Sequence, residues 1–192
     1  MHQPYRLAIF ASGSGSNAER IVEYFRHHPH ISVEVILTNN PKAYVVERAH
    51  RLNIPALIFN REEFPAKAPE WLGQYQITHI VLAGFLWLIP DTLLKAYPDR
   101  IINIHPALLP KFGGKGMYGM KIHEMVRRLN ETETGITIHV INERYDEGPV
   151  LYQAACQVSE DDTPEMIAAK VHELEYKWYP VVIEKWVMGT TP

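Results

Sequence analysis

Two polar side chains stand two residues apart in the segment Asn103-Ile104-His105-Pro106. Residues 100–104 read as a buried strand, and alternate residues of a strand point to the same side of its sheet. A carboxamide beside an imidazole suits a reaction that develops an oxyanion and moves a proton near neutral pH. The alternative is a purely structural role, in which His105 only caps the turn before Pro106. Asn103 and His105 are therefore candidate catalytic residues, with that alternative left open.

A glycine-rich turn, Gly13 to Asn17, separates a predicted strand at 6–11 from a helical pattern that begins at Asn17. Glycines permit close backbone approach, and the free N–H groups at a helix start attract an anion. The turn lacks the Gly-Lys-Ser/Thr of a P-loop and the third glycine of a dinucleotide fingerprint. It is either a tight strand-to-helix turn or a site for a single phosphate. In the second case a valine at Gly15 should obstruct the phosphate.

Two more polar residues are placed less clearly by their sequence context. His139 alternates with Ile138 and Val140 on a predicted strand, so it is either a satisfied inward polar residue or a second site residue. Asp146 stands shortly before Gly148-Pro149, where an Asp is usually a turn residue that bonds its own backbone. A carboxylate near an imidazole would instead orient the ring and raise its pKa.

The elements that must position these residues follow a regular alternation. Short β-branched runs alternate with helical patterns, and the expected strands are 6–11, 33–37, 54–59, 77–83 and 100–104. This alternation indicates βαβ units and an α/β fold, a Rossmann-like, mostly parallel sheet flanked by helices. Ligands of such sheets bind beyond the carboxyl ends of the strands. The segments 13–17, 84–89 and 105–110 should therefore meet in one cleft.

The second half of the chain has a different pattern. Two strands, 135–141 and 150–158, are joined by a turn-rich loop, and a last helix begins with Thr163 as N-cap and Pro164 at its first position. The glycine-rich segment Phe112 to Gly119 reads as a mobile loop. No linker or repeat divides the chain, so we expect a single domain over residues 1–192.

Composition narrows the class of protein. The chain has 192 residues and 19 Lys and Arg against 22 Asp and Glu, a formal net charge of −3, which argues against a nucleic-acid-binding or membrane-surface protein. The single cysteine, Cys156, excludes an internal disulfide and suits a reducing compartment. The first strand follows the N-terminus closely, which leaves no room for a signal peptide, and a cytoplasmic location is expected. The histidines at 27, 28 and 30 lack neighbouring ligands at metal spacing, so we expect a solvated helix end and no metal.

Five segments, in order along nearly the whole chain, are similar to those of the phosphoribosylglycinamide formyltransferases, a folate-dependent family. They are Ala11-Ser12-Gly13-Ser14-Gly15-Ser16-Asn17, Leu82-Ala83-Gly84-Phe85, Asn103-Ile104-His105-Pro106-Ala107-Leu108-Leu109-Pro110, Gly135-Ile136-Thr137-Ile138-His139 and Asp146-Glu147-Gly148-Pro149-Val150-Leu151-Tyr152-Gln153. The Asn-x-His-Pro segment marks the wider formyltransferase superfamily, and the Gly-Ser-Asn turn narrows the resemblance.

The resemblance implies a role for each matching residue. Asn103, His105 and Asp146 match the catalytic trio of the family, and His139 is a possible supporting residue behind them. The substrate-phosphate loop is matched by Gly15, Ser16 and Asn17. Glu175 matches a position that contacts the glycinamide substrate.

The folate side of the site is implied in the same way. Asn103 also faces the folate, and the stretch whose backbone holds the pterin is matched by Leu86, Trp87, Leu88 and Ile89. Lys67 falls where many members have an Arg near the folate tail. There are two departures: Trp87 replaces a common Arg, and the segment 113–119 is longer than the usual short turn.

The resemblance implies transfer of the formyl group of 10-formyltetrahydrofolate to the amine of glycinamide ribonucleotide, without a metal. The partners expected are these small molecules, not nucleic acid or membrane, and the sequence does not give the oligomeric state. The alternatives are a formyltetrahydrofolate hydrolase or an amino-sugar formyltransferase with the same trio. An alternative of another class is a non-catalytic phosphate-binding module in which His105 is structural.

Overall fold

The computed structural model describes residues 5–144 and 146–190. One sheet of seven strands runs through it, in the spatial order β3-β2-β1-β4-β5-β6-β7. The strands are β1 (Tyr5–Phe10), β2 (Ile31–Thr38), β3 (Ala56–Ile58), β4 (His79–Leu82), β5 (Ile101–His105), β6 (Glu133–Val140) and β7 (Val150–Gln157). The first five strands pair in parallel, and β6 and β7 extend the sheet with antiparallel pairs. The predicted α/β fold with a mostly parallel sheet is confirmed.

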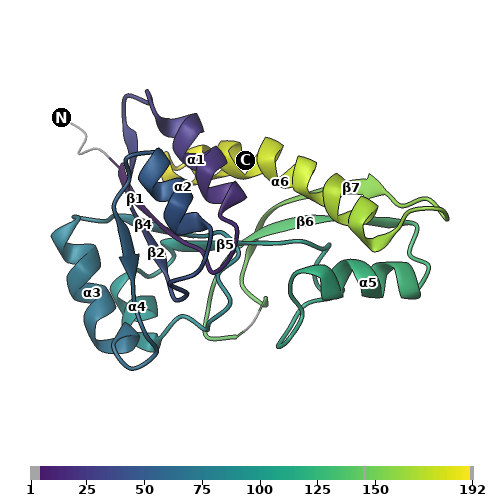
Figure 1. The fold of residues 1–192 in the computed structure, drawn as a ribbon, viewed down its shortest axis with the longest axis horizontal. Coiled ribbons are helices and arrows are strands. Elements are labelled where there is room, and N and C mark those ends of the chain that lie inside the picture. The colour runs from purple at the N-terminus through teal and green to yellow at the C-terminus, as the bar shows by residue number, and fades with distance from the viewer. Residues whose placement is uncertain (1–4, 145, 191–192) are drawn as a thin grey trace.

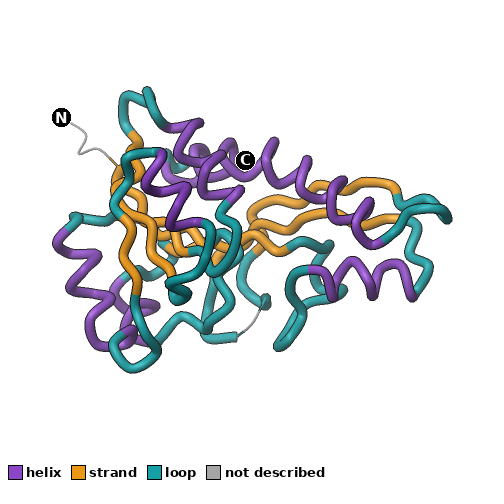
Figure 2. Tube along the Cα trace, viewed as in Figure 1, coloured by secondary structure: helices purple, strands orange, loops and turns teal. Residues whose placement is uncertain are grey.

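Six helices cover this sheet. They are α1 (Ser16–Phe25), α2 (Val45–Arg51), α3 (Phe64–Gln74), α4 (Asp91–Ala96), α5 (Met120–Arg128) and α6 (Pro164–Val187). Figure 1 shows α1 and α6 over one face of the sheet and α3 and α4 over the other, while α5 lies beside the β6–β7 extension. Figure 2 shows the same layers by type of structure, with the strands between the helices. No helix in the described parts of the chain is long and apolar enough to cross a membrane.

The two faces of the sheet bury separate cores. One core joins α1, α2 and α6 to the sheet through side chains such as Ile21, Val45 and Ile183. The other joins α3 and α4 to the opposite face through Phe64 and Leu93. Both faces of the parallel strands are therefore buried, which explains their nearly continuous apolar sequences.

The long helix α6 is fixed at both its start and its middle. The Thr163 hydroxyl accepts a hydrogen bond from the Met166 N–H, and Pro164 follows at the first helical position, as predicted. Farther along, the fully buried Tyr179 hydroxyl donates to the Leu82 carbonyl at 2.8 Å. Because Leu82 is the last residue of β4, this bond attaches α6 to the carboxyl ends of the strands, where ligands are expected.

Two helices differ from the sequence expectation. The pattern at 71–75 is only the end of α3, which starts at Phe64 and contains Pro65 and Pro69. Helix α5 was not predicted at all. Its buried residues are Ile122, His123 and Val126, a narrow face that packs against Ile167 of α6 and Ala107.

Candidate active site

A cavity of about 670 Å³ lies beyond the carboxyl ends of β1, β4 and β5. The chain order of strands reverses between β1 and β4, and such a switch point is where open α/β sheets bind ligands. Segments 12–17, 82–89 and 103–106 line it together with parts of α5, α6 and the loop after β6. The expected meeting of three strand ends is confirmed, except that residues 107–110 lie outside the wall.

The glycine-rich turn forms one end of the cavity. Its carbonyl groups are held by α2: the Val45 N–H donates to the Gly13 oxygen at 3.1 Å, and Arg48 Nε donates to the Ser14 oxygen at 2.8 Å. Since the N–H of a peptide points opposite to its carbonyl, the N–H groups that follow are directed away from α2. Helix α1 begins at Ser16, so its free N–H groups add to this positive end. The turn is therefore built to accept an anion.

The expectation that a valine at Gly15 would test phosphate binding is wrong. A Cβ at Gly15 would lie 2.6 Å from Val45 Cβ and 2.9 Å from Val45 Cα, and the residue has a φ of +74°. A side chain there would therefore collide with α2 in the protein interior. Gly13, which also lines the cavity, has no atom within 4 Å of such a Cβ.

Asn103 and His139 form a hydrogen-bonded pair in the cavity wall. Asn103 on β5 stands opposite Leu82 on one side and His139 on the other. His139 Nδ1 lies 3.2 Å from the Val140 carbonyl, which accepts only, so this nitrogen carries the proton. Its Nε2 then accepts from Asn103 Nδ2 at 3.3 Å. Burial lowers the pKa of His139, which keeps the ring neutral, and the second N–H of Asn103 remains for a ligand.

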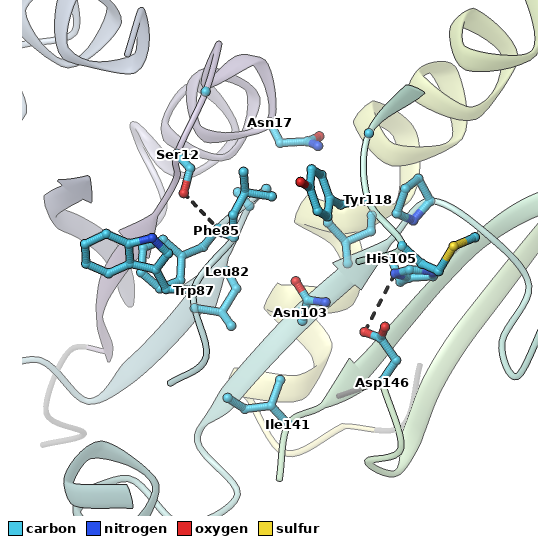
Figure 3. Close-up of a pocket in the computed structure, with 18 of the residues that line it drawn as sticks. Ser12, Asn17, Leu82, Phe85, Trp87, Asn103, His105, Tyr118, Ile141 and Asp146 are labelled. Carbon is cyan, nitrogen blue, oxygen red and sulfur yellow. Dashed lines mark hydrogen bonds and ion pairs between the residues drawn. The ribbon is translucent and has the colours of Figure 1, made fainter. Parts of the chain in front are cut away.

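His105 and Asp146 come together although they are far apart in sequence. His105 Nδ1 lies 3.7 Å from Asp146 Oδ1, and His139 Nε2 lies at the same distance from that oxygen. Figure 3 shows the pair beside Asn103, with the Asp146 carboxylate directed at the His105 ring. Asp146 is a turn residue as well, because its φ is +57°, a conformation that Asp tolerates. Asp146 therefore lies in a turn, as predicted, but its carboxylate bonds the Gly114 N–H, and no bond to its own backbone is found among the described residues. Its catalytic role stays a prediction.

The glycine-rich segment 112–119 is bonded to both members of this pair. His105 Nε2 donates to the Phe112 carbonyl at 2.8 Å, and the Gly114 N–H donates to Asp146 Oδ2 at 2.9 Å. Tyr118 from the same segment projects between Asn17 and His105 (Figure 3). No pattern in the sequence predicted these contacts. The expected mobility of the segment stays a prediction.

A largely apolar wall forms another part of the cavity lining. It contains all four residues expected on the pterin side, namely Leu86, Trp87, Leu88 and Ile89. The Leu86 N–H donates to the Ser12 hydroxyl at 3.0 Å, which joins this stretch to the end of β1 (Figure 3). Leu86 and Leu88 are about half exposed, as expected of side chains at the rim of a pocket that takes a large ligand.

Glu175 reaches the cavity from α6. Its Oε2 accepts from Asn17 Nδ2 and from His172 Nδ1, both at 2.9 Å. The bond to Glu175 raises the pKa of His172, opposed by partial burial. Asn17, Ser16 and Glu175 all line the cavity, so the structure brings the expected phosphate and glycinamide residues together. Their roles stay predictions.

Lys67 is the one expected site residue that the structure does not bring to the cavity. It lies exposed on α3, where its Nζ pairs with Glu63 Oε1 at 2.8 Å. The cation next to the wall is instead Arg61, whose guanidinium stacks 4.9 Å from the centroid of the Trp87 ring. Trp87, the departure from the family pattern, is what holds Arg61 there, and sequence spacing alone could not show this contact.

The geometry thus defines an α/β protein whose cavity brings together a carboxamide, an imidazole and a carboxylate with a glycine-rich turn and a largely apolar wall. A model of the formyl transferase family matches residues 5–183. The chain is 40% identical to the phosphoribosylglycinamide formyltransferase of Bacillus subtilis, over 94% of this chain and 93% of that protein. It is 41% identical to a chloroplastic phosphoribosylglycinamide formyltransferase of Arabidopsis thaliana, over 95% of this chain and 66% of that protein.

Solved structures agree with these sequence relatives. Glycinamide ribonucleotide transformylase 1 from Symbiobacterium toebii superposes with a TM-score of 0.89 at 31% identity, over 98% of this chain and 90% of that one. Phosphoribosylglycinamide formyltransferase from Bacillus halodurans gives a TM-score of 0.84 at 39% identity, over 94% of both chains. The chain belongs to the formyl transferase family, and within it to the phosphoribosylglycinamide formyltransferases.

Proposed function

We propose that this protein transfers the formyl group of 10-formyltetrahydrofolate to the amine of glycinamide ribonucleotide, a step of purine biosynthesis. The observation that carries the proposal is the position of Asn103, His105 and Asp146 between an anion-binding turn and an apolar wall. A phosphorylated amine would bind with its phosphate at the turn, and a flat aromatic formyl donor would bind at the wall. Their reacting atoms would then meet at the trio.

The reaction needs little beyond this arrangement. The amine nitrogen forms a bond to the formyl carbon, the bond from that carbon to N10 of the folate breaks, and the proton lost by the amine balances the one gained by N10. The free N–H of Asn103 donates to the formyl oxygen as negative charge develops on it, a contribution of ~10²–10³-fold.

His105 and Asp146 manage the proton. Because Nε2 of His105 donates to Phe112, Nδ1 is the nitrogen that changes its protonation, and it faces Asp146. The carboxylate stabilises the protonated ring, and the 3.7 Å separation is that of an ion pair, longer than a direct hydrogen bond. General acid–base groups of this kind contribute ~10²–10⁴-fold.

The wall at Leu86–Ile89 fits the folate. Four largely apolar side chains offer a surface for a pterin ring, and the backbone between them offers polar groups for its edge. We assign Arg61, in place of Lys67, to the carboxylates of the folate tail, since no described carboxylate pairs with Arg61 and its guanidinium lies on Trp87. The cytoplasmic location and the absence of nucleic-acid partners remain predictions from the composition.

A substrate panel tests this proposal. The purified protein is given 10-formyltetrahydrofolate with glycinamide ribonucleotide, with an amino-sugar nucleotide, or with water alone, and formyl product and formate are measured separately. We expect formyl transfer to the ribonucleotide and little formate. Formate release that does not depend on an amine would indicate a hydrolase, and folate binding without any turnover would indicate a non-catalytic module.

A further inference from the structure

His123 is a buried histidine in the cavity wall that the mechanism above does not use. It lies on α5, is 2% exposed, and its Nδ1 is closed off from solvent without a hydrogen-bond partner in residues 5–144 and 146–190. Leaving a buried polar atom unpaired destabilises a folded chain. Functional sites are where such costs are expected, because a ring that is oriented for a ligand through one nitrogen can leave its other nitrogen unpaired.

The ring of His123 is neutral and has a single N–H. Burial, and then the nearby His172, lower its pKa to about 4, against the opposing effect of Glu175. An orphaned buried N–H is rarer than an orphaned acceptor, so the proton belongs on Nε2 and the bare nitrogen is Nδ1. Because Nδ1 is the enclosed atom, Nε2 is the nitrogen that the ring presents to the cavity. His123 is thus a neutral donor.

Glu175 stands near this donor as an acceptor. Its Oε2 is used by Asn17 and His172, and no described residue bonds its Oε1. A carboxylate repels a phosphate, so the phosphate belongs at the turn and Glu175 must face uncharged or cationic donors of the substrate. In a 5-phosphoribosyl compound, the groups next to the phosphate are the ribose hydroxyls. A hydroxyl both accepts and donates one hydrogen bond with ease.

We propose that His123 is a substrate-positioning residue whose Nε2–H donates to a ribose hydroxyl that itself donates to Glu175. The proposal rests on the proposed function, since it takes the ribonucleotide as the ligand of this end of the cavity. If so, His123 and Glu175 together make the site specific for a substrate with a ribose over one with a deoxyribose. It also gives α5, a helix without apparent signal in the sequence, a direct part in substrate recognition.

Two substitutions at His123 separate this role from a structural one. His123→Phe removes the donor and the unpaired nitrogen together, whereas His123→Gln keeps an N–H donor. We expect His123→Phe to raise the KM for glycinamide ribonucleotide about tenfold, the effect of one lost hydrogen bond. The KM for the folate and the Tm of the free protein should not worsen, and His123→Gln should recover most of the affinity.

A matched control is His79→Phe. His79 is a partly buried histidine whose pKa is likewise lowered to about 4, but it packs between Tyr5 and Trp186, outside the cavity wall. We expect this variant to leave the KM for the ribonucleotide unchanged. A similar KM increase in both variants would show a general effect of replacing buried histidines and would overturn the proposal.

Deoxyribose analogues provide the decisive comparison. For the analogue that lacks the contacted hydroxyl, 2′-deoxy or 3′-deoxy, the effect of His123→Phe should disappear. An equal loss with the ribose substrate and both analogues, or no loss with any, would overturn the proposal. If the wild-type protein transfers no formyl group to the ribonucleotide, the proposed function fails. Calorimetric titration of the ribonucleotide then tests this inference separately. Weaker binding to His123→Phe than to the wild type would support the inference, and equal binding would refute it.

Discussion

Gly13 and Gly15 lie in the same turn, yet the structure predicts opposite consequences for replacing them with alanine. The new Cβ of Gly15→Ala would meet Val45 at 2.6 and 2.9 Å, and Gly15 has a left-handed backbone. The backbone strain is about 1–2 kcal/mol and overpacking adds about 1–3 kcal/mol. We therefore expect Gly15→Ala to lower the free energy of unfolding by about 2–5 kcal/mol.

Gly13→Ala should instead act on the ligand. Its Cβ meets no protein atom within 4 Å, so the fold should tolerate it. If the methyl group keeps the phosphate from one charge-assisted N–H bond, the loss of about 1.5–3 kcal/mol raises the KM for the ribonucleotide by about 10- to 150-fold.

Urea unfolding and steady-state kinetics on both variants, with each substrate varied in turn, check these two expectations. A Gly15→Ala protein as stable as the wild type would refute the packing argument. A Gly13→Ala protein with an unchanged KM for the ribonucleotide, or with an equal increase for the folate, would show that the phosphate does not bind at this turn.

The structure supports four further predictions, three in the site and one outside it. Asp146→Asn keeps the side-chain shape and should lower kcat by ~10²–10⁴-fold with little change in substrate binding titrations; near-normal kcat would leave Asp146 a turn residue only. His139→Leu should lower kcat by less than the ~10²–10³-fold expected for an oxyanion donor, because the carboxamide is still present but unoriented; unchanged kcat would contradict that support. Arg61→Ala should raise the KM for a folate with its glutamate tail by about 2- to 5-fold and Lys67→Ala should not, and the reverse result would restore the original assignment. Because burial lowers the pKa of His79 to about 4, the unfolded chain binds more protons as pH falls below 6.5; stability should fall over that range, and His79→Phe should reduce the fall in urea titrations at about pH 7 and pH 5.

The sequence predicted those features whose residues all lie in a single strand or helix. Asn103 and His105 share a strand, so their spacing alone predicted that both face the cleft, and both line the cavity. The N-cap at Thr163 was equally local, and the structure confirms it. In such cases the periodicity of the backbone is the only information needed.

Features that depend on tertiary contacts were beyond the sequence. Helix α5 was missed: its three buried residues, Ile122, His123 and Val126, recur at helical spacing, but one of them, His123, is polar. The approach of Asp146 to His105 depends on how the loop after β6 folds back, and the position of Arg61 depends on the ring of Trp87. Neither contact has a counterpart in local spacing, and Lys67 was expected near the folate tail only because of the family resemblance.

The two bonds between the segment 112–119 and the catalytic pair have a consequence for fidelity. In a formyl transfer to an amine, water is a competing acceptor of the formyl group. Phe112 and Gly114 are bonded to the two residues that we propose handle the proton, so a displacement of the segment would break both bonds together. Opening of the site to solvent would then coincide with loss of the proposed catalytic arrangement, which would limit transfer of the formyl group to water.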